Sequence, residues 1–319
     1  MAKDSNKPFE FCGKIIEPGQ KTKFLYEFSR FYTRKKLTIP FHVFNGEKIG
    51  PKFFIFGTLH GDELNGIEII NRLQKHPAMK EICGTIIMLP VANPYGLIFQ
   101  TRNIKNKDLN RSFPGDENGS LASRLTYFYT QEIITKCDFG LDLHSGGKFL
   151  FNFPHVRIAA KSEESKRIAR EFGVPVLGTS VPEKSLRKLA LSYKIPLLVY
   201  EGGEAGRLNE ECIAIGVQGI LNVLAYLKII NEQWKNQDSS YSIYFSKAKW
   251  IRAPASGLLT TNKELISTVS EKQLIAEISD PFGIEKTIEV LSTCNGVVFA
   301  KTTAPMVNEG DPLFHVCMY

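Results

Sequence analysis

Short apolar runs alternate with segments of helical periodicity along residues 1–230 of the chain. Runs such as 53–57 (FFIFG) lack polar alternation, which is typical of strands buried on both faces of a sheet. Apolar residues at 64, 67, 70 and 73 recur every three or four positions, which predicts a helix. The strands predicted in this way are 53–57, 85–90, 139–143 and 196–200, and the helices are 63–75, 121–134, 161–172 and 209–228.

This alternation predicts the fold class. Strands that alternate with helices form an α/β fold, here a mixed, largely parallel sheet with helices on both faces. Functional loops in such folds lie beyond the carboxyl ends of the strands. His60, His144 and Glu201 each follow directly on a predicted strand, so we expect them at one edge of the sheet.

The pattern changes after the polar stretch 231–240, which predicts a linker. We therefore divide the chain into an α/β domain, residues 1–240, and a small all-β domain, residues 241–319. Within the tail, SGLL at 256–259 is echoed by NGVV at 295–298, which suggests a barrel or sandwich of two similar units. The tail resembles lipoyl/biotinyl domains but has no lysine in the hairpin context of those carriers, so we expect a structural role.

Composition and cysteine usage bear on the compartment. Hydrophobic residues make up 43% and charged residues 23% of the chain, as in ordinary globular proteins. The polar start of the chain lacks the apolar core of a secretory signal, and no apolar run approaches the roughly 20 residues of a membrane span. The six cysteines form no CxxC pair, which favours buried free thiols. A cytoplasmic protein is the expectation.

The net charge of +7 is modest for 319 residues. The basic residues at 30 and 34–36 alternate with apolar ones, which indicates a solvated strand or hairpin. We therefore expect neither a nucleic acid nor a membrane as partner. Long-range attraction of a small anionic substrate is the better inference from this charge. A homo-oligomer is compatible with the sequence, which does not determine the oligomeric state.

The pattern His60-Gly-Asp-Glu63 places an imidazole and a carboxylate where a strand gives way to a helix. Zinc accepts both ligand types, and a catalytic zinc site needs three protein ligands and one open position. His144, at the end of a later strand, supplies the third candidate. A lone HxxE arises often by chance, and a polar pair at a helix start is the plain alternative.

Further polar residues favour chemistry over that alternative. Asn110 and Arg111 lie side by side and are preceded by Arg102. Arginine suits carboxylate recognition because its planar fork donates two parallel hydrogen bonds, although each arginine alone would read as a surface charge. Glu201 precedes Gly202 and Gly203, where the backbone lets a ligand approach, and a carboxylate there suits a general base. The alternative is that Glu201 is an acidic loop residue without a catalytic role.

The order HGDE, NPYG, DLNRSFPG, DLH and YEGG resembles the succinylglutamate desuccinylase/aspartoacylase family, relatives of the zinc carboxypeptidases. The resemblance covers roughly residues 53–208, and the β-rich tail is also similar to that of family members. It implies a zinc carboxypeptidase-like fold. It also implies one zinc ion per chain bound by His60, Glu63 and His144, with Glu201 as the catalytic base, Arg102 polarising the scissile carbonyl, Asn110 and Arg111 binding the substrate carboxylate, and Arg187 as a further carboxylate ligand.

The expected activity is that of a zinc-dependent amidohydrolase whose substrate is a small N-acyl amino acid. A zinc carboxypeptidase or a cell-wall peptide amidase is the alternative, followed by a non-catalytic zinc-binding module. Three ligands and a candidate base speak against the module, because structural zinc sites usually have four ligands. The remaining histidines, which are His42, His76, His155 and His315, are expected to be surface or structural residues.

Overall fold

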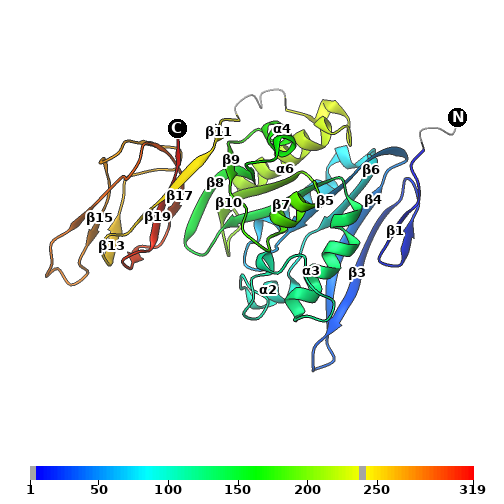
Figure 1. The fold of residues 1–319 in the computed structure, drawn as a ribbon, viewed down its shortest axis with the longest axis horizontal. Helices are drawn as coiled ribbons and strands as arrows, with labels where there is room; N and C mark the ends of the chain where they lie inside the picture. The colour runs from blue at the N-terminus through cyan, green and yellow to red at the C-terminus, as the bar shows by residue number, and fades with distance from the viewer. Residues whose placement is uncertain (1–4, 237–241) are drawn as a thin grey trace.

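A computed structural model describes residues 5–236 and 242–319 (Figure 1). The strands are β1 Phe9–Phe11, β2 Lys14–Ile16, β3 Lys21–Arg30, β4 Lys36–Asn45, β5 Lys48–Gly57, β6 Cys83–Leu89, β7 Phe139–Gly146, β8 Leu150–Ala159, β9 Val176–Thr179, β10 Leu197–Glu204, β11 Tyr244–Phe245, β12 Lys247–Arg252, β13 Gly257–Thr260, β14 Thr268–Val269, β15 Leu274–Ser279, β16 Ile288–Leu291, β17 Gly296–Thr302, β18 Met306–Val307 and β19 Pro312–Met318. The α-helices are α1 Asn65–Lys75, α2 Pro94–Phe99, α3 Leu121–Glu132, α4 Glu163–Glu171, α5 Leu186–Ser192 and α6 Glu210–Tyr226. Short 3₁₀ turns cover Pro77–Lys80, Leu109–Arg111, Ile134–Lys136 and Glu232–Trp234.

The centre of the molecule is a mixed sheet in which β6, β5, β7 and β10 run parallel. Phe53 to Phe56 on β5 are at most 1% exposed, as expected for a strand covered on both faces. The antiparallel pairs β3–β4 and β4–β6 extend one side, and β8 pairs antiparallel with β10 on the other. The predicted mixed, largely parallel α/β sheet is confirmed.

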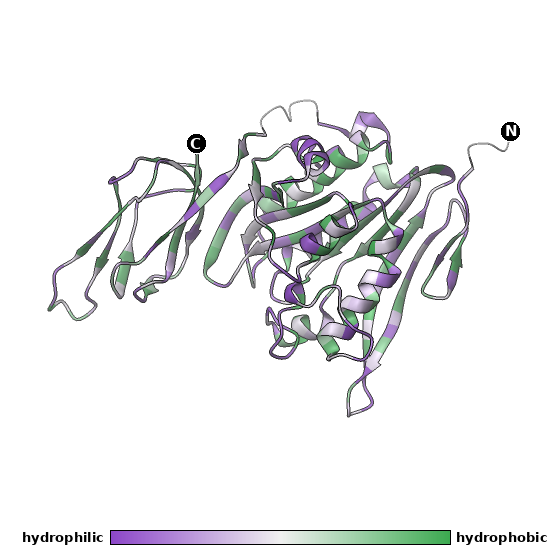
Figure 2. Cartoon of the chain, viewed as in Figure 1, coloured by the Kyte–Doolittle hydropathy of each residue, from purple (hydrophilic) through white to green (hydrophobic). Residues whose placement is uncertain are grey.

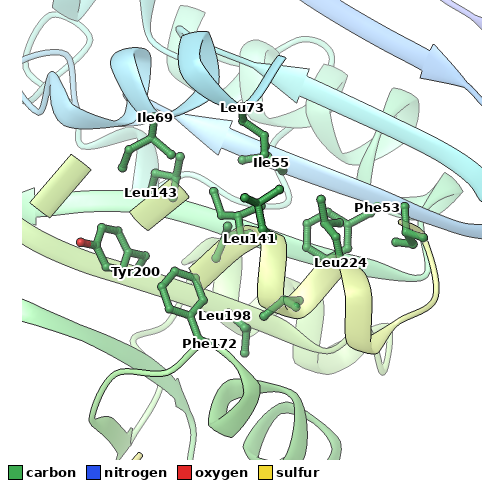
Figure 3. Close-up of a cluster of buried hydrophobic side chains, with 14 of the residues drawn as sticks. Phe53, Ile55, Ile69, Leu73, Leu141, Leu143, Phe172, Leu198, Tyr200 and Leu224 are labelled. Atoms are coloured by element: carbon green, nitrogen blue, oxygen red, sulfur yellow. The ribbon is translucent and has the colours of Figure 1, made fainter. Parts of the chain in front are cut away.

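Helices cover both faces of this sheet (Figure 1). One core lies under α1, α4 and α6, where Ile69, Leu143 and Phe172 are among the buried side chains (Figure 3). A second core lies under α3 and α5, with Leu125 and Tyr129 contributed by α3. Hydrophobic residues accordingly concentrate on the central strands and the inner sides of the helices (Figure 2). Apolar side chains on both sheet faces are the reason for the unbroken apolar runs in the sequence.

The four predicted helices occur with slightly different ends, and α1 begins at Asn65 rather than at residue 63. That difference leaves Glu63 in the loop between β5 and α1. Serine side chains cap three helix starts: Ser120 accepts a hydrogen bond from Ser123 N, and Ser162 and Ser185 do the same for α4 and α5. The short helices α2 and α5 and the strands β8 and β9 were not predicted from the sequence.

The tail is an antiparallel β region at one end of the molecule (Figure 1). Strands β16, β15, β13 and β18 form one sheet, while β12, β19 and β17 continue the central sheet through the β17–β8 pair. A core that includes Ile278, Val298 and Phe314 fills the space between the two layers. The likeness to a lipoyl-type barrel stays a prediction, and so does the division at residue 240. The last four residues of the predicted linker, 237–240, lie outside the described residues.

The basic cluster, the cysteines and the helix lengths were also subjects of predictions from the sequence. The basic cluster forms the β3–β4 hairpin, where Glu27 pairs with Arg30 and Lys36. All six cysteines are free thiols, and four of them are buried. Among the described residues, no helix is long and apolar enough to cross a membrane.

Candidate active site

Three parallel strands bring the predicted site residues to one edge of the sheet. His60 follows β5 directly, His144 lies near the end of β7, and Glu201 lies on β10 as the register partner of His144. A tight turn closed by the hydrogen bond from Glu63 N to His60 O folds the β5–α1 loop back. Because parallel strands end at the same edge, this loop and the ends of β7 and β10 meet there.

His60, Glu63 and His144 converge on a single point. The Nδ1 atoms of His60 and His144 lie 2.7 Å and 2.8 Å from the two oxygens of Glu63, and 3.1 Å from each other. All three side chains are buried, and one ligand atom from each lies within 4.8 Å of the others. Two imidazole nitrogens and a carboxylate are a donor set that suits zinc.

The far nitrogen of each imidazole is bound by a different carboxylate. His144 Nε2 lies 2.7 Å from Asp142 Oδ2, and His60 Nε2 lies 3.2 Å from Asp108 Oδ1. A carboxylate in this position holds the proton on Nε2 and leaves the Nδ1 lone pair for a metal. With Nε2 protonated in this way, each Nδ1 can give its lone pair to a cation bound at the same point.

The charge on Glu63 is stabilised inside this buried site. Burial raises the pKa of Glu63, but His60 and His144 lower it more, so that the pKa lies below its ordinary value. The backbone N–H of Ser145 also donates to Glu63 Oε2 at 3.0 Å. Glu63 is therefore a carboxylate anion, the form that coordinates a metal.

Arg102 lies beside the three converging side chains. Its NH1 atom is 3.3 Å from Glu63 Oε1, and its Nε and NH2 atoms donate to Asp108 Oδ2. The side chain is 43% exposed, so the guanidinium also faces the open side of the site. Arg102 can thus donate to an oxygen atom of a ligand near the convergence point.

Asn110 and Arg111 lie on the 3₁₀ turn that begins after Asp108. Asp108 Oδ1 accepts a hydrogen bond from Asn110 N, so the same carboxylate orients His60 and starts the turn. Asn110 Oδ1 accepts from Leu186 N at 2.9 Å, which connects the turn to α5. Arg111 is exposed and donates from NH1 to Asn110 O at 2.6 Å.

A cleft of about 430 Å³ opens next to this turn, between Asp108, Arg111, Lys107 and Lys184. Three cations and one carboxylate on its wall favour an anionic occupant. Of the predicted site residues, Arg111 lines this cleft, and Asp108 on its wall also contacts His60.

Glu201 is 9% exposed and is contacted by side chains of the neighbouring strand β8. Asn152 donates to Glu201 Oε2 at 3.0 Å, and Arg157 NH1 lies 3.6 Å from Glu201 Oε1. Gly203 has φ 82°, and a Cβ there would lie 2.3 Å from Asn209 Oδ1, so the backbone at this position excludes other residues. Neither contact of Glu201 was predicted from the sequence.

Arg187 lies on α5 and is largely buried. Its NH1 atom donates to Thr179 Oγ1 at 2.9 Å. Burial lowers the pKa of Arg187 to about 10; the positive charge of Arg157 adds to this, whereas Glu201 and Asp142 oppose it. The charge of Arg187 therefore interacts with Glu201 from the α5 side, although its contacts are with Thr179 and the backbone.

The sequence did not point to four residues that contact the predicted ligands and base, which are Asp108, Asp142, Asn152 and Arg157. A signal was present for Asp142, because Asp142-Leu-His144 on a strand places the two polar side chains on the same face. No such signal exists for Asn152 and Arg157, because they contact Glu201 only through the β8–β10 pairing.

Comparison with known proteins adds independent information. A curated relative, the N-alpha-acetyl-L-2,4-diaminobutyric acid deacetylase of Halomonas elongata, is 27% identical over 279 residues, which is 83% of this chain and 81% of the relative. The product-bound structure of the ectoine utilization protein EutE (DoeB) from Ruegeria pomeroyi superposes with a TM-score of 0.85 at 19% identity, covering 98% of this chain and 99% of that one. A succinylglutamate desuccinylase/aspartoacylase structure from Rhodobacter sphaeroides gives 0.81 at 24% identity, covering 94% of both chains. At these identities the two structures establish a shared fold.

The sequence also matches the family model of the succinylglutamate desuccinylase/aspartoacylase catalytic domain. The match covers residues 49–227, more than half of the chain, and contains every predicted site residue. The chain therefore belongs to the succinylglutamate desuccinylase/aspartoacylase family.

Proposed function

We propose that this protein is a zinc-dependent amidohydrolase that cleaves the amide bond of a small N-acyl amino acid. The observation that carries the proposal is the convergence of His60, Glu63 and His144, with the far nitrogen of each imidazole bound by a carboxylate. Family membership and the relative named as a deacetylase of an N-acetylated amino acid support the same reaction class.

The donor set fits one zinc ion per chain. His60 and His144 would bind through Nδ1 and Glu63 through its carboxylate. Among the described residues the cluster has three members, which suits a catalytic site better than a structural one with four ligands. When bound, zinc lowers the pKa of water to about 7 and polarises an amide carbonyl.

The proton transfers fall to Glu201. It takes a proton from the attacking water and passes it to the leaving amine, so that the amine departs neutral. Asn152 holds one of its oxygens, which keeps the carboxylate oriented during both transfers. The partly exposed guanidinium of Arg102 donates to the carbonyl oxygen as negative charge develops there.

The polar and cationic residues beside the metal ligands orient the substrate. Asn110 and Arg111 bind the substrate's carboxylate, and Arg187 binds a further anionic group. When the substrate carboxylate is fixed, the amide is held in a defined orientation relative to the catalytic groups. This orientation increases the rate of hydrolysis. The cleft beside Arg111, with Lys107 and Lys184 on its wall, favours anionic substrates.

The tail favours a small substrate over a peptide. Thr303 of the tail donates to Glu204, three residues after Glu201, at 3.1 Å, and its backbone N–H donates to Phe149 O. The tail thus packs against the strand that carries the proposed base. We infer that the tail, held in this way, limits the length of the substrate that the site accepts.

An assay of released amine tests the proposal. N-acetyl and N-succinyl amino acids and a set of peptides would be incubated with the metal-depleted protein, with and without added zinc. We expect zinc-dependent release from N-acyl amino acids and little from peptides. Preferential release from peptides would favour the peptidase alternative, and no release from any substrate at any zinc concentration would refute the proposal.

A further inference from the structure

The strand β8 supplies the side chains that surround the proposed base. We propose that Arg157, held in place by His155, is a positioning residue for Glu201. This inference rests on the proposed function, because it assigns Arg157 and His155 a part in orienting the general base of that reaction. Both residues lie inside the matched range 49–227 but outside the five sequence motifs that carry the family resemblance.

The two oxygens of Glu201 are contacted by two donors from the same strand. Asn152 Nδ2 lies 3.0 Å from Oε2, and Arg157 NH1 lies 3.6 Å from Oε1. Donors on both sides restrict rotation of the carboxylate about its last bond. At 3.6 Å the guanidinium attracts Oε1 by charge without a short hydrogen bond, so the lone pairs of Oε1 stay available for a proton.

His155 determines where the guanidinium of Arg157 points. The imidazole is 0% exposed, and its Nδ1 donates to Phe153 O at 2.6 Å. Nε2 is then the acceptor, and it receives the Nε–H of Arg157 at 3.1 Å. Only a neutral imidazole donates at one nitrogen and accepts at the other. Burial and then the charge of Arg157 lower the pKa of His155 well below its ordinary value, which keeps the ring neutral.

The strand register explains why these side chains meet. Glu201 is paired with His155 and Val199 with Arg157, so the base and both β8 residues project from one face of the sheet. The contacts therefore follow one another along a single strand pair, from Phe153 O to His155, then to Arg157 and then to Glu201. They provide a rigid support for the base that is independent of the metal ligands.

The competing view is that Arg157 binds the substrate. Arg157 and Arg187 are both cations beside Glu201, and either could face a substrate anion. The two views differ in the kinetic constant that changes. Loss of a positioning residue lowers kcat with little change in KM, whereas loss of uniform substrate binding raises KM.

The test compares Arg157→Met, His155→Leu and the double variant, with Arg167→Met on the exposed face of α4 as the matched control. We expect Arg157→Met to lower kcat between about tenfold and 100-fold with KM changed by less than about twofold, as for a misoriented catalytic group. We expect His155→Leu to lower kcat less. The double variant should be no slower than Arg157→Met alone, because His155 acts through Arg157. His155→Gln, which keeps an acceptor for the Arg157 Nε–H, should recover most of the rate, and Arg167→Met should match the wild type.

Three results would overturn the inference. They are a raised KM with unchanged kcat in Arg157→Met, additive losses in the double variant, and a Glu201 carboxylate that keeps its orientation in a crystal structure of Arg157→Met. Arg157→Lys serves as the second variant if Arg157→Met does not fold, which thermal melting would reveal. Failure of the proposed function is distinct, because the wild type would then release no amine while the crystal structures would still report the orientation of Glu201.

Discussion

The imidazole of His144 and the carboxylate of Asp142 meet at 2.7 Å between Nε2 and Oδ2, two residues apart on β7. Both side chains are buried, so water does not compete for this contact. The pair turns the opposite nitrogen of His144 toward His60 and Glu63. Metal affinity at this site should therefore depend on a residue that is not itself a ligand.

Replacing Asp142 tests that dependence. Asp142→Ala should weaken zinc binding about 10- to 100-fold, the usual cost of removing such a partner. Asp142→Asn should cost less, because the amide oxygen still accepts from Nε2. Competition titration against a chelator of known affinity measures both. An unchanged zinc Kd in a folded Asp142→Ala protein would contradict the expectation.

The ligand assignment leads to a stoichiometric prediction. The purified protein should carry about one zinc per chain, and chelation should abolish hydrolysis. His60→Ala and His144→Ala should each lose most of the zinc, because two remaining ligands hold a catalytic zinc poorly. Metal analysis after gel filtration measures the content. Full zinc retention in both variants would exclude this site.

Glu201→Gln should keep zinc and lose most of the activity. The amide is nearly isosteric with the carboxylate and can still accept from Asn152, but it cannot take up a proton. General acid–base catalysis contributes about 10²–10⁴-fold, and kcat should fall by that factor. Glu204→Gln, on the same strand, is the matched control and should retain activity. A loss of less than about threefold in Glu201→Gln would remove Glu201 as the base.

Arg111 can be tested with a cycle that changes the enzyme and the substrate together. Arg111→Lys keeps the charge but loses the planar fork, so kcat/KM should fall for a substrate with a free carboxylate. Most of that loss should disappear when a neutral amide replaces the carboxylate. The expected coupling is on the order of 1.5–3 kcal/mol, the range for hydrogen bonds to charged groups.

The alternative for Arg111 follows from its contact with Asn110 O, which would brace the turn. In that case Arg111→Lys would reduce hydrolysis of both substrates equally. The coupling between the two changes would then be close to zero. Measuring kcat/KM for the four combinations distinguishes the two roles.

The buried His315 predicts a pH dependence of stability. Burial, with the nearby charge of Arg157, lowers the pKa of His315 from 6.5 to about 3. Between these values the unfolded chain binds a proton that the folded chain does not, so the free energy of unfolding decreases as the pH falls from 6.5 toward 3. The contribution is at most about 1.4 kcal/mol per pH unit.

His315→Gln should therefore flatten the dependence of the free energy of unfolding on pH between 4 and 6. From about one pH unit above 6.5, His315 is neutral in both the folded and the unfolded state, and the difference between variant and wild type should become independent of pH. Denaturant titrations at several pH values measure the slope. An identical slope in both proteins would show that His315 does not contribute.

The fold class, the family and the candidate metal ligands could all be predicted from the sequence. The central strands could be recognised because burial on both faces leaves unbroken apolar runs, and α1 and α6 because their apolar residues repeat with the helical period. His60 and Glu63 could be identified because both lie in one short loop after such a strand. Each of these features depends on residues that are close together in the sequence, so the sequence pattern reveals it.

The side chains that contact the predicted ligands and base could be identified in the folded chain alone. Asp108 reaches His60, and Asn152 and Arg157 reach Glu201, across strand pairings and loops that no sequence spacing encodes. The continuation of the central sheet into the tail through the β17–β8 pair was also not predicted, because short antiparallel strands carry little periodicity. Pairing between distant segments depends on the burial and register of the whole sheet, which is why these relationships exist only in the folded chain.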